Sequence, residues 1–159
     1  MGYPFQSILS PIELDDPSLV ALGVAQQIAA DQHATLHLLH VVQLLPGFGE
    51  ADVIEDEHSV AEQQAHARLE EIAKSHLTGV NHQLHTAAAS GRALPKAVVR
   101  VATEVNADLI VMKTNGRKGL SHFILGNVTE EVVRTAPCPV LTLAPAAQEK
   151  AAPPCGTQT

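Results

Sequence analysis

Five short runs of apolar, β-forming residues alternate with segments of helical spacing along this chain of 159 residues. The runs lie at 7–12, 35–42, 81–88, 109–112 and 140–143. Their length and composition are typical of strands in a sheet. Regular alternation of strands and helices predicts parallel strands with right-handed crossovers. The sequence therefore predicts an α/β fold, a single doubly wound five-stranded parallel sheet of Rossmann-like type with helices on both faces.

The segments between these runs carry apolar residues at intervals of three and four positions. Asp16 and Pro17 predict the start of the first helix, as its N-cap and first helical residue. A long helix is predicted from about Ser59 to His76, and residues 94–105 give the clearest helical stripe. The predicted apolar faces comprise Val20, Ala21, Val24, Ala25 and Ile28; Ala61, Ala65, Leu69, Ile72 and Ala73; Leu94, Ala97, Val98, Val101, Ala102 and Val105; and Val128, Val132 and Val133.

The domain prediction is one α/β domain over residues 1–144. Residues 145–159 have no apolar periodicity and are predicted to form a disordered C-terminal tail. Residues 43–58 combine Pro and Gly with many acidic residues and are interpreted as a connecting loop. Polar alternation in 81–88 predicts a strand near the edge of the sheet. Aromatic residues make up only 3%, so the core is expected to consist of Ala, Val, Leu and Ile.

Charge and composition exclude several classes of protein. The formal net charge of −7 argues against binding to nucleic acid, which needs a broad basic face. No apolar run approaches the length of about 18 residues that suggests a membrane span, and we see no signal peptide. A cytoplasmic protein is expected. The two cysteines provide no disulfide framework, and Cys138 is expected to be a buried, small apolar residue.

The stretch that follows the fourth run has the features of an anion site. The apolar run Leu109–Met112 ends at Lys113, and a basic loop with Gly116 and Arg117 leads to a helix start at Gly126-Asn127-Val128. A glycine loop before a helix N-terminus is an arrangement that binds phosphate. Ligands of such sheets bind beyond the carboxyl ends of the strands, where the strand order reverses. The alternative is a loop that only turns the chain.

Signatures of metal binding and of hydrolytic catalysis are absent from the sequence. It has nine histidines, but no HExxH pair, no paired cysteines at metal-ligand spacing and no G-x-S-x-G motif. His37 and His40 lie three positions apart on a predicted strand and should point to opposite faces. We therefore predict no metal and no hydrolytic nucleophile.

Several of these segments together resemble the universal stress protein family. The resemblance rests on 107–112, 116–120, 125–128 and 136–141, with 8–13 and 38–42 fitting the same pattern, and it extends over residues 5–144. It implies a fold like that of the adenine nucleotide alpha hydrolases. It also implies a homodimer in which the last strands of two subunits, Val140–Leu143 here, pair with each other.

The family includes members that bind ATP or a related nucleotide and members that do not. The binders carry G-x2-G-x9-G-[S/T], whose positions fall on Lys113, Gly116, Gly126 and Asn127 here. Lys113 is the main departure, because a side chain there could block the site or reach the phosphates, and would be strained at positive φ. The predicted adenine-nucleotide site comprises Pro11, Ile12, Glu13, Val41, Met112, Lys113, Gly116, Arg117, Gly126, Asn127 and Val128.

The sequence leaves three functional hypotheses open. The first is a stress-response protein that binds ATP, ADP or AMP in a regulatory role. The second is a nucleotide-free dimeric module that acts through a protein partner, with Lys113 abolishing nucleotide binding. The third is an enzyme, either an ATPase with at most slow hydrolysis or a nucleotidyl transferase, in which Glu13 or Asp15 would help to hold a metal.

Overall fold

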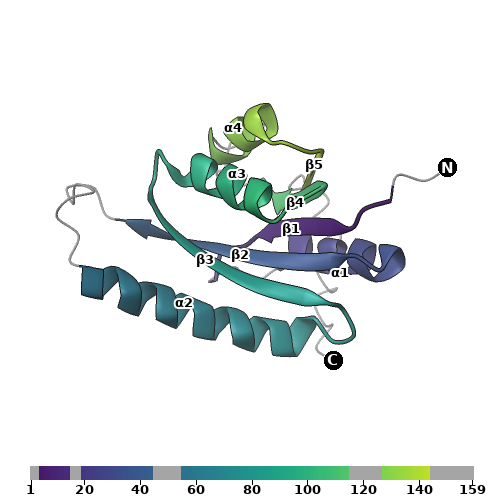
Figure 1. Ribbon diagram of the computed structural model, residues 1–159, viewed down its shortest axis with the longest axis horizontal. Coiled ribbons are helices and arrows are strands. Elements are labelled where there is room, and N and C mark those ends of the chain that lie inside the picture. Colours follow the sequence, from purple (N-terminus) through teal and green to yellow (C-terminus); the bar gives the residue numbers. More distant parts are fainter. Residues whose placement is uncertain (1–3, 15–18, 45–54, 115–126, 144–159) are drawn as a thin grey trace, which may run out of the picture.

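A computed structural model describes residues 4–14, 19–44, 55–114 and 127–143, with the backbone alone for 55–59 and 127. The described part of the chain forms five strands and four helices, which are labelled in Figure 1. The strands are β1 (Ser7–Pro11), β2 (Thr35–Leu44), β3 (His82–Ser90), β4 (Leu109–Lys113) and β5 (Val140–Leu143). The helices are α1 (Val20–Gln32), α2 (Glu55–His76), α3 (Leu94–Glu104) and α4 (Asn127–Thr135).

All described strands belong to one parallel sheet with the order β3-β2-β1-β4-β5. The predicted five-stranded doubly wound sheet is thus confirmed, and β3 lies at an edge. The chain builds outward from β1 to β3 and then returns to place β4 on the other side of β1. The strand order therefore reverses between β1 and β4, which is where ligands bind in such sheets.

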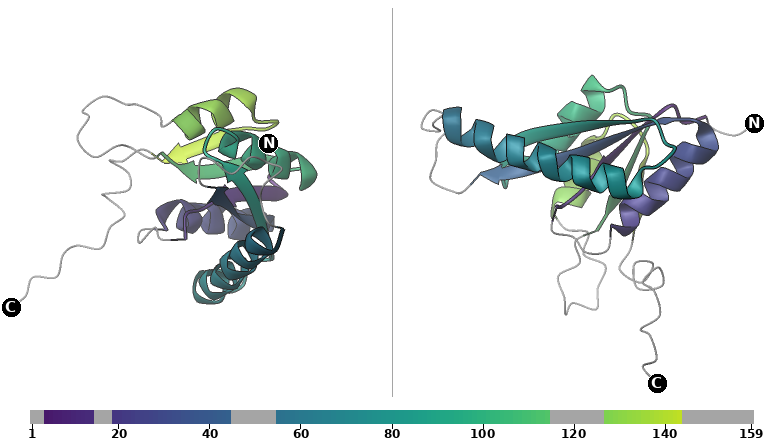
Figure 2. Two further views of the ribbon diagram at one scale, coloured as in Figure 1. Left: turned by 90° about the vertical axis from the view of Figure 1, so that its left-hand side faces the viewer. Right: turned by 90° about the horizontal axis from the view of Figure 1, so that it is seen from below.

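Two hydrophobic clusters lie on opposite faces of the sheet. The first packs α1 and α2 against one face, and the second packs α3 and α4 against the other (Figure 2). Both consist mainly of Ala, Val, Leu and Ile, as the low aromatic content predicts. Strand residues alternate between the clusters: Ile8, Leu36, Leu38, Leu109 and Val111 face the first, and Leu9, Leu39, Val41, Ile110 and Met112 face the second.

The observed helix faces largely agree with the predicted stripes, with departures in α1 and in α4, where Val133 is 47% exposed. Helix α3 buries Ala97, Val98, Val101 and Ala102, all of them predicted. Helix α1 instead buries Ala21, Leu22, Ala25 and Ala29 and leaves Val24 and Ile28 only partly buried. Small alanines bring the helix close to the sheet, and the branched residues therefore lie at the margins of the contact.

Several predicted boundaries are wrong by one to four residues; strand β3, for example, extends to Ser90 rather than to residue 88. Helix α1 begins at Val20 rather than Pro17, because Leu19 at its N-cap position has a left-handed backbone with φ +41°; Asp16 and Pro17 lie outside the described residues. Strand β2 continues to Leu44, since β3 pairs with it along its length. Helix α2 already includes residue 55, which lies within the predicted loop of residues 43–58.

No helix in the described ranges is long and apolar enough to cross a membrane. The predicted C-terminal tail, residues 145–159, lies outside the described residues.

Candidate functional site

The carboxyl ends of β1 and β4 bring together two charged residues that are a hundred positions apart in sequence. Glu13 follows β1, and Lys113 is the last residue of β4. The Lys113 Nζ lies 3.9 Å from Glu13 Oε2. The two strands are neighbours in the sheet (Figure 1), so this ion pair spans the point where the strand order reverses.

Lys113 adopts an ordinary strand backbone. It pairs with Leu143 in the β4–β5 ladder, and the non-glycine residues with positive φ in the described ranges are Leu19, His33 and Asn106. The strain expected for a side chain at this motif position therefore does not arise. The replacement of glycine by lysine changes the charge and size of the group here without distorting the chain.

The segment after β1 is held against β2 by two hydrogen bonds. The Ile12 N–H donates to the Leu39 carbonyl at 2.8 Å, and the His40 Nδ1 lies 3.0 Å from the Ile12 carbonyl. These bonds fix the direction in which Glu13 leaves the sheet. Sequence reasoning assigned His40 no role, because the bond depends on the register between β1 and β2.

The backbone of β2 presents polar groups just beyond the end of β1. The N–H and C=O of one strand residue point to the same side, and this side repeats every second residue. Since Leu39 accepts its bond from Ile12, the N–H and C=O of Val41 also point toward the side of β1. The ladder between β1 and β2 ends at Pro11, which is paired with Leu39. One donor and one acceptor thus face the region past Pro11.

The exit of β4 is fixed by β5. Thr114 is buried, and both its N–H and its hydroxyl donate to the Leu143 carbonyl, at 3.1 and 3.0 Å. Met112 is buried in the second hydrophobic cluster, so it contributes packing to the floor of the region. Thr114 was not among the predicted site residues, although a hydroxyl directly after a buried strand was a visible signal.

Helix α4 begins at Asn127, as predicted. The first turn of a helix carries N–H groups without intrahelical partners and a partial positive charge, which favour anions. Val128 packs against the second hydrophobic cluster. It also lines a pocket of about 480 Å³ between the start of α3 and α4, together with Gly91, Arg92, Pro95, Glu130, Glu131 and Arg134.

The structure brings most of the described site residues to one edge of the sheet. Pro11, Ile12, Glu13, Met112 and Lys113 surround the carboxyl ends of β1 and β4, and the backbone of Val41 faces the same side. Gly116, Arg117 and Gly126 lie outside the described residues, and Asn127 is described by its backbone alone.

Two histidines that the sequence left unassigned form a partly buried pair away from this edge. The His37 Nδ1 lies 2.9 Å from the His85 Nε2, which joins β2 to β3. Burial lowers the pKa of both imidazoles, and for His37 the neighbouring His85 lowers the pKa further. Leu36 and Leu38 of β2 face the first cluster, and Leu39 and Val41 face the second. By the alternation of strand residues, His40 points to the first face and His37 to the second, as predicted.

Two other polar side chains are buried or partly buried. The Ser10 hydroxyl is fully buried and has no hydrogen-bond partner within the described residues. Cys138 is half-buried against the second cluster, rather than buried as expected, because it precedes the edge strand β5. Burial, and then the Asp108 carboxylate, raise the pKa of the Cys138 thiol, which keeps it in its less reactive protonated form.

Within the described ranges, no three His, Cys, Asp or Glu side chains lie close enough together to hold a metal ion. The groups near Glu13 are a cation, backbone amides and apolar side chains. These groups can recognise the charge of a ligand and the pattern of its hydrogen-bond donors and acceptors.

Comparison with known proteins gives one consistent result. The family model described as the universal stress protein family matches residues 4–143. The universal stress protein MJ0531 of Methanocaldococcus jannaschii is 32% identical over 145 residues, which cover 87% of this chain and 82% of the relative.

Solved structures show the same fold. The hypothetical protein MJ0577 is 22% identical with a TM-score of 0.68, covering 89% of this chain and 97% of that protein. A universal stress protein solved with cAMP is 23% identical, with a TM-score of 0.59 and coverages of 89% and 98%. The universal stress protein of Archaeoglobus fulgidus solved with dAMP is 18% identical, with a TM-score of 0.55 and coverages of 88% and 98%. Because the family model spans nearly all of the sheet and its helices, the chain belongs to the universal stress protein family.

Proposed function

We propose that the protein binds an adenine nucleotide at the carboxyl ends of β1 and β4, in a regulatory rather than a catalytic role. The observation that carries this proposal is the convergence of the Glu13–Lys113 ion pair and the backbone of Val41 on the point where the strand order reverses. Two structures of the same fold, solved with cAMP and with dAMP, add support, since both ligands contain adenine and one phosphate.

In the proposed complex each part of the nucleotide meets a group of matching chemistry. The N–H and C=O of Val41 bond the N1 acceptor and the N6 donor of adenine, while Pro11 and Ile12 pack beside the base. Glu13 accepts bonds from the ribose hydroxyls, as an acidic residue does in other nucleotide-binding sheets. The phosphate is bound by Lys113 and by the N-terminus of α4 at Asn127 and Val128, with Gly116, Arg117 and Gly126 of the connecting loop.

The proposed assembly is a homodimer formed through the edge strand β5. Strand β5 pairs with β4 on one side, and its Leu141 is 37% exposed. Val133 on α4 is 47% exposed. Unpaired strand edges favour pairing with another chain. We assign the dimer to a cytoplasmic stress response, with ATP, ADP or AMP as the signal that it reads.

The Lys113–Glu13 ion pair also favours a second candidate function, a nucleotide-free dimeric module that acts through a protein partner. In that case Lys113 and Glu13 neutralise each other and the lysine side chain occupies the ligand region. The two candidates differ in whether a nucleotide can displace this contact.

Isothermal titration calorimetry with AMP, ADP and ATP tests the proposal, with GMP as the control ligand. The base edge of guanine reverses the donor and acceptor positions that Val41 would meet. We expect binding of AMP at least tenfold tighter than that of GMP, which corresponds to about 1.4 kcal/mol. Absence of heat, and of any shift in melting temperature, with millimolar adenine nucleotides would contradict the proposal and leave the nucleotide-free module.

A further inference from the structure

The Lys113–Glu13 ion pair occupies the region where the sugar and phosphate of a ligand would lie. Its two groups come from opposite sides of the strand reversal, so a ligand bound there meets both of them. The Lys113 side chain is only 22% exposed, whereas that of Glu13 is 52% exposed. The lysine side chain therefore lies mostly against the protein, and the carboxylate is the more solvent-exposed partner.

This ion pair is easily exchanged for a stronger one. At a separation of 3.9 Å and with one partner half-exposed, an ion pair contributes little to stability, because water and salt screen it. A phosphate carries up to two negative charges and three acceptor oxygens, and charge-assisted bonds to it are strong. A phosphate close to Nζ therefore competes well with the Glu13 carboxylate.

We propose that Lys113 determines ligand specificity by exchanging Glu13 for the 5′-phosphate of the nucleotide, so that the site selects phosphorylated ribonucleosides over nucleosides. This inference rests on the nucleotide-binding function proposed above. In the exchange, the ammonium binds the phosphate and the released carboxylate accepts bonds from the ribose hydroxyls. Both charges remain paired or hydrogen-bonded in the complex.

A neutral nucleoside cannot drive this exchange. Adenosine offers hydroxyl groups to Glu13 but no anion to Lys113, so binding would leave the ammonium without its carboxylate. The ion pair thus penalises adenosine more than AMP, because the phosphate of AMP replaces the carboxylate that Lys113 gives up. Lys113, which replaces a glycine of the motif, thus selects nucleotides over nucleosides. Its ordinary strand backbone accommodates the side chain without strain.

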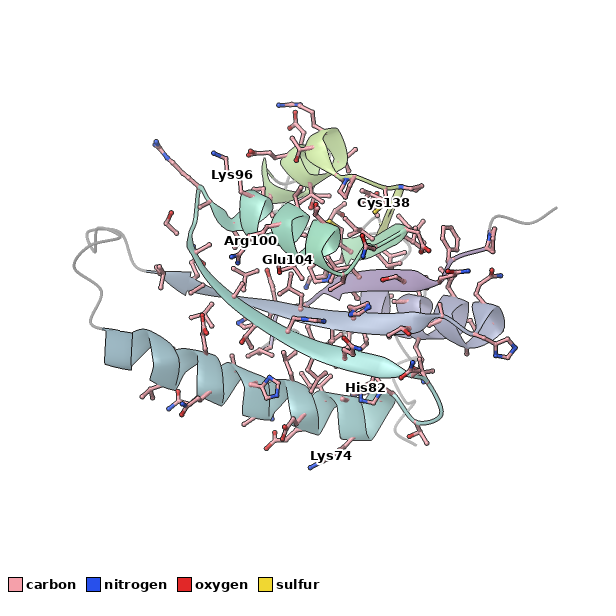
Figure 3. The ribbon with its side chains drawn as sticks, viewed as in Figure 1. Lys74, His82, Lys96, Arg100, Glu104 and Cys138 are labelled. Carbon is pink, nitrogen blue, oxygen red and sulfur yellow. The ribbon has the colours of Figure 1, made fainter. Side chains whose placement is uncertain are left out.

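The test compares the AMP-to-adenosine affinity ratio, measured by calorimetry at fixed ionic strength, in four proteins. They are the wild type, Lys113→Met, Glu13→Gln and the control Lys74→Met. Methionine keeps much of the length of lysine but removes its charge. Lys74 is exposed in the last turn of α2. The end of α2 lies near the start of β3, so Lys74 lies at the amino ends of the strands, opposite to the candidate site (Figure 3).

We expect the wild type and Lys74→Met to bind AMP at least tenfold tighter than adenosine. In Lys113→Met the ratio falls to within about threefold, chiefly because AMP binds more weakly. Glu13→Gln binds AMP at least as tightly as the wild type, because the competing carboxylate is gone while an amide oxygen still accepts from the ribose. Thermal unfolding of each variant establishes that it is folded.

Two outcomes overturn the inference while leaving nucleotide binding intact. They are an unchanged ratio in Lys113→Met and a loss of AMP affinity greater than tenfold in Glu13→Gln. If no protein binds AMP, both the inference and the proposed function fail. If Lys113→Met or Glu13→Gln binds AMP and the wild type does not, the ion pair closes the site permanently and the exchange does not occur.

Discussion

The pairing of β2 with β3 brings the rings of His37 and His85 together, and the pKa of both histidines is lowered in the folded protein. The two rings share one hydrogen bond of 2.9 Å, in which one nitrogen donates and the other accepts. A neutral acceptor is therefore required. His37 is only 6% exposed, and burial disfavours its charged form. Of the charged groups around His85, Glu104 on α3 raises its pKa and His66 on α2 lowers it.

This pair predicts a loss of stability in mild acid. Both imidazoles have a pKa below the ordinary value of 6.5 in the folded state, so the unfolded chain binds more protons just below that pH. The stabilisation is complete above about pH 6.5 and is lost as the pH falls toward the lowered values. The slope cannot exceed about 1.4 kcal/mol per pH unit for each proton taken up. Urea unfolding at several pH values between 7.5 and 5 measures how the free energy of unfolding depends on pH.

A double variant, His37→Gln with His85→Gln, supplies the comparison. Its free energy of unfolding should depend less steeply on pH over this range than that of the wild type. His76→Gln is the matched control, because His76 is exposed in the last turn of α2. Equal slopes in the wild type and the double variant would show that other groups cause the acid sensitivity.

At the scale of elements, Asp108 joins the starts of β1 and β4. Its carboxylate accepts the Gln6 N–H at 2.7 Å and the Ser7 N–H at 3.2 Å, and its own N–H donates to the Ser7 carbonyl. The Ser7 hydroxyl adds a bond of 2.9 Å to the Val105 carbonyl at the end of α3. These bonds set the register of the two strands whose opposite ends carry Glu13 and Lys113.

Replacement of Asp108 by alanine should therefore destabilise the protein by about 1–3 kcal/mol, because backbone N–H groups lose a charged acceptor in a partly buried place. Urea unfolding at a fixed protein concentration measures the change. Asp31→Ala is the matched control, since Asp31 is exposed on α1 and receives only weak bonds from Gln27. An effect within about 0.5 kcal/mol of that control would contradict this role of Asp108.

At the scale of the whole molecule, the fold could be predicted because each strand and each helix has its own local pattern in the sequence. Strands appear as short apolar runs, and helices appear as apolar residues at intervals of three and four positions. The stripe of α3 indicates which face of that helix is covered, and the continuous buried run of β4 indicates that the sheet is covered on both faces. Alternation of such elements leaves few topologies. Boundaries were less predictable. The end of β2 depends on its pairing with β3, and the start of α1 depends on the backbone of Leu19.

The contacts of the candidate site could be predicted only in part. The order of the elements placed Glu13 and Lys113 after their strands, but their ion pair depends on β1 and β4 being neighbours. The bonds from His40 to Ile12 and from Thr114 to Leu143 depend on register in the same way. Such contacts join residues about 28 to 100 positions apart, and no local pattern in the sequence encodes them.

The most direct test of nucleotide binding at this edge is a crystal structure of the protein grown with millimolar AMP. The account predicts adenine beside the backbone of Val41, the ribose near Glu13, and the phosphate between Lys113 and the start of α4. Density for AMP elsewhere, such as the pocket lined by Arg92 and Arg134, or its absence at a saturating concentration, would contradict the account.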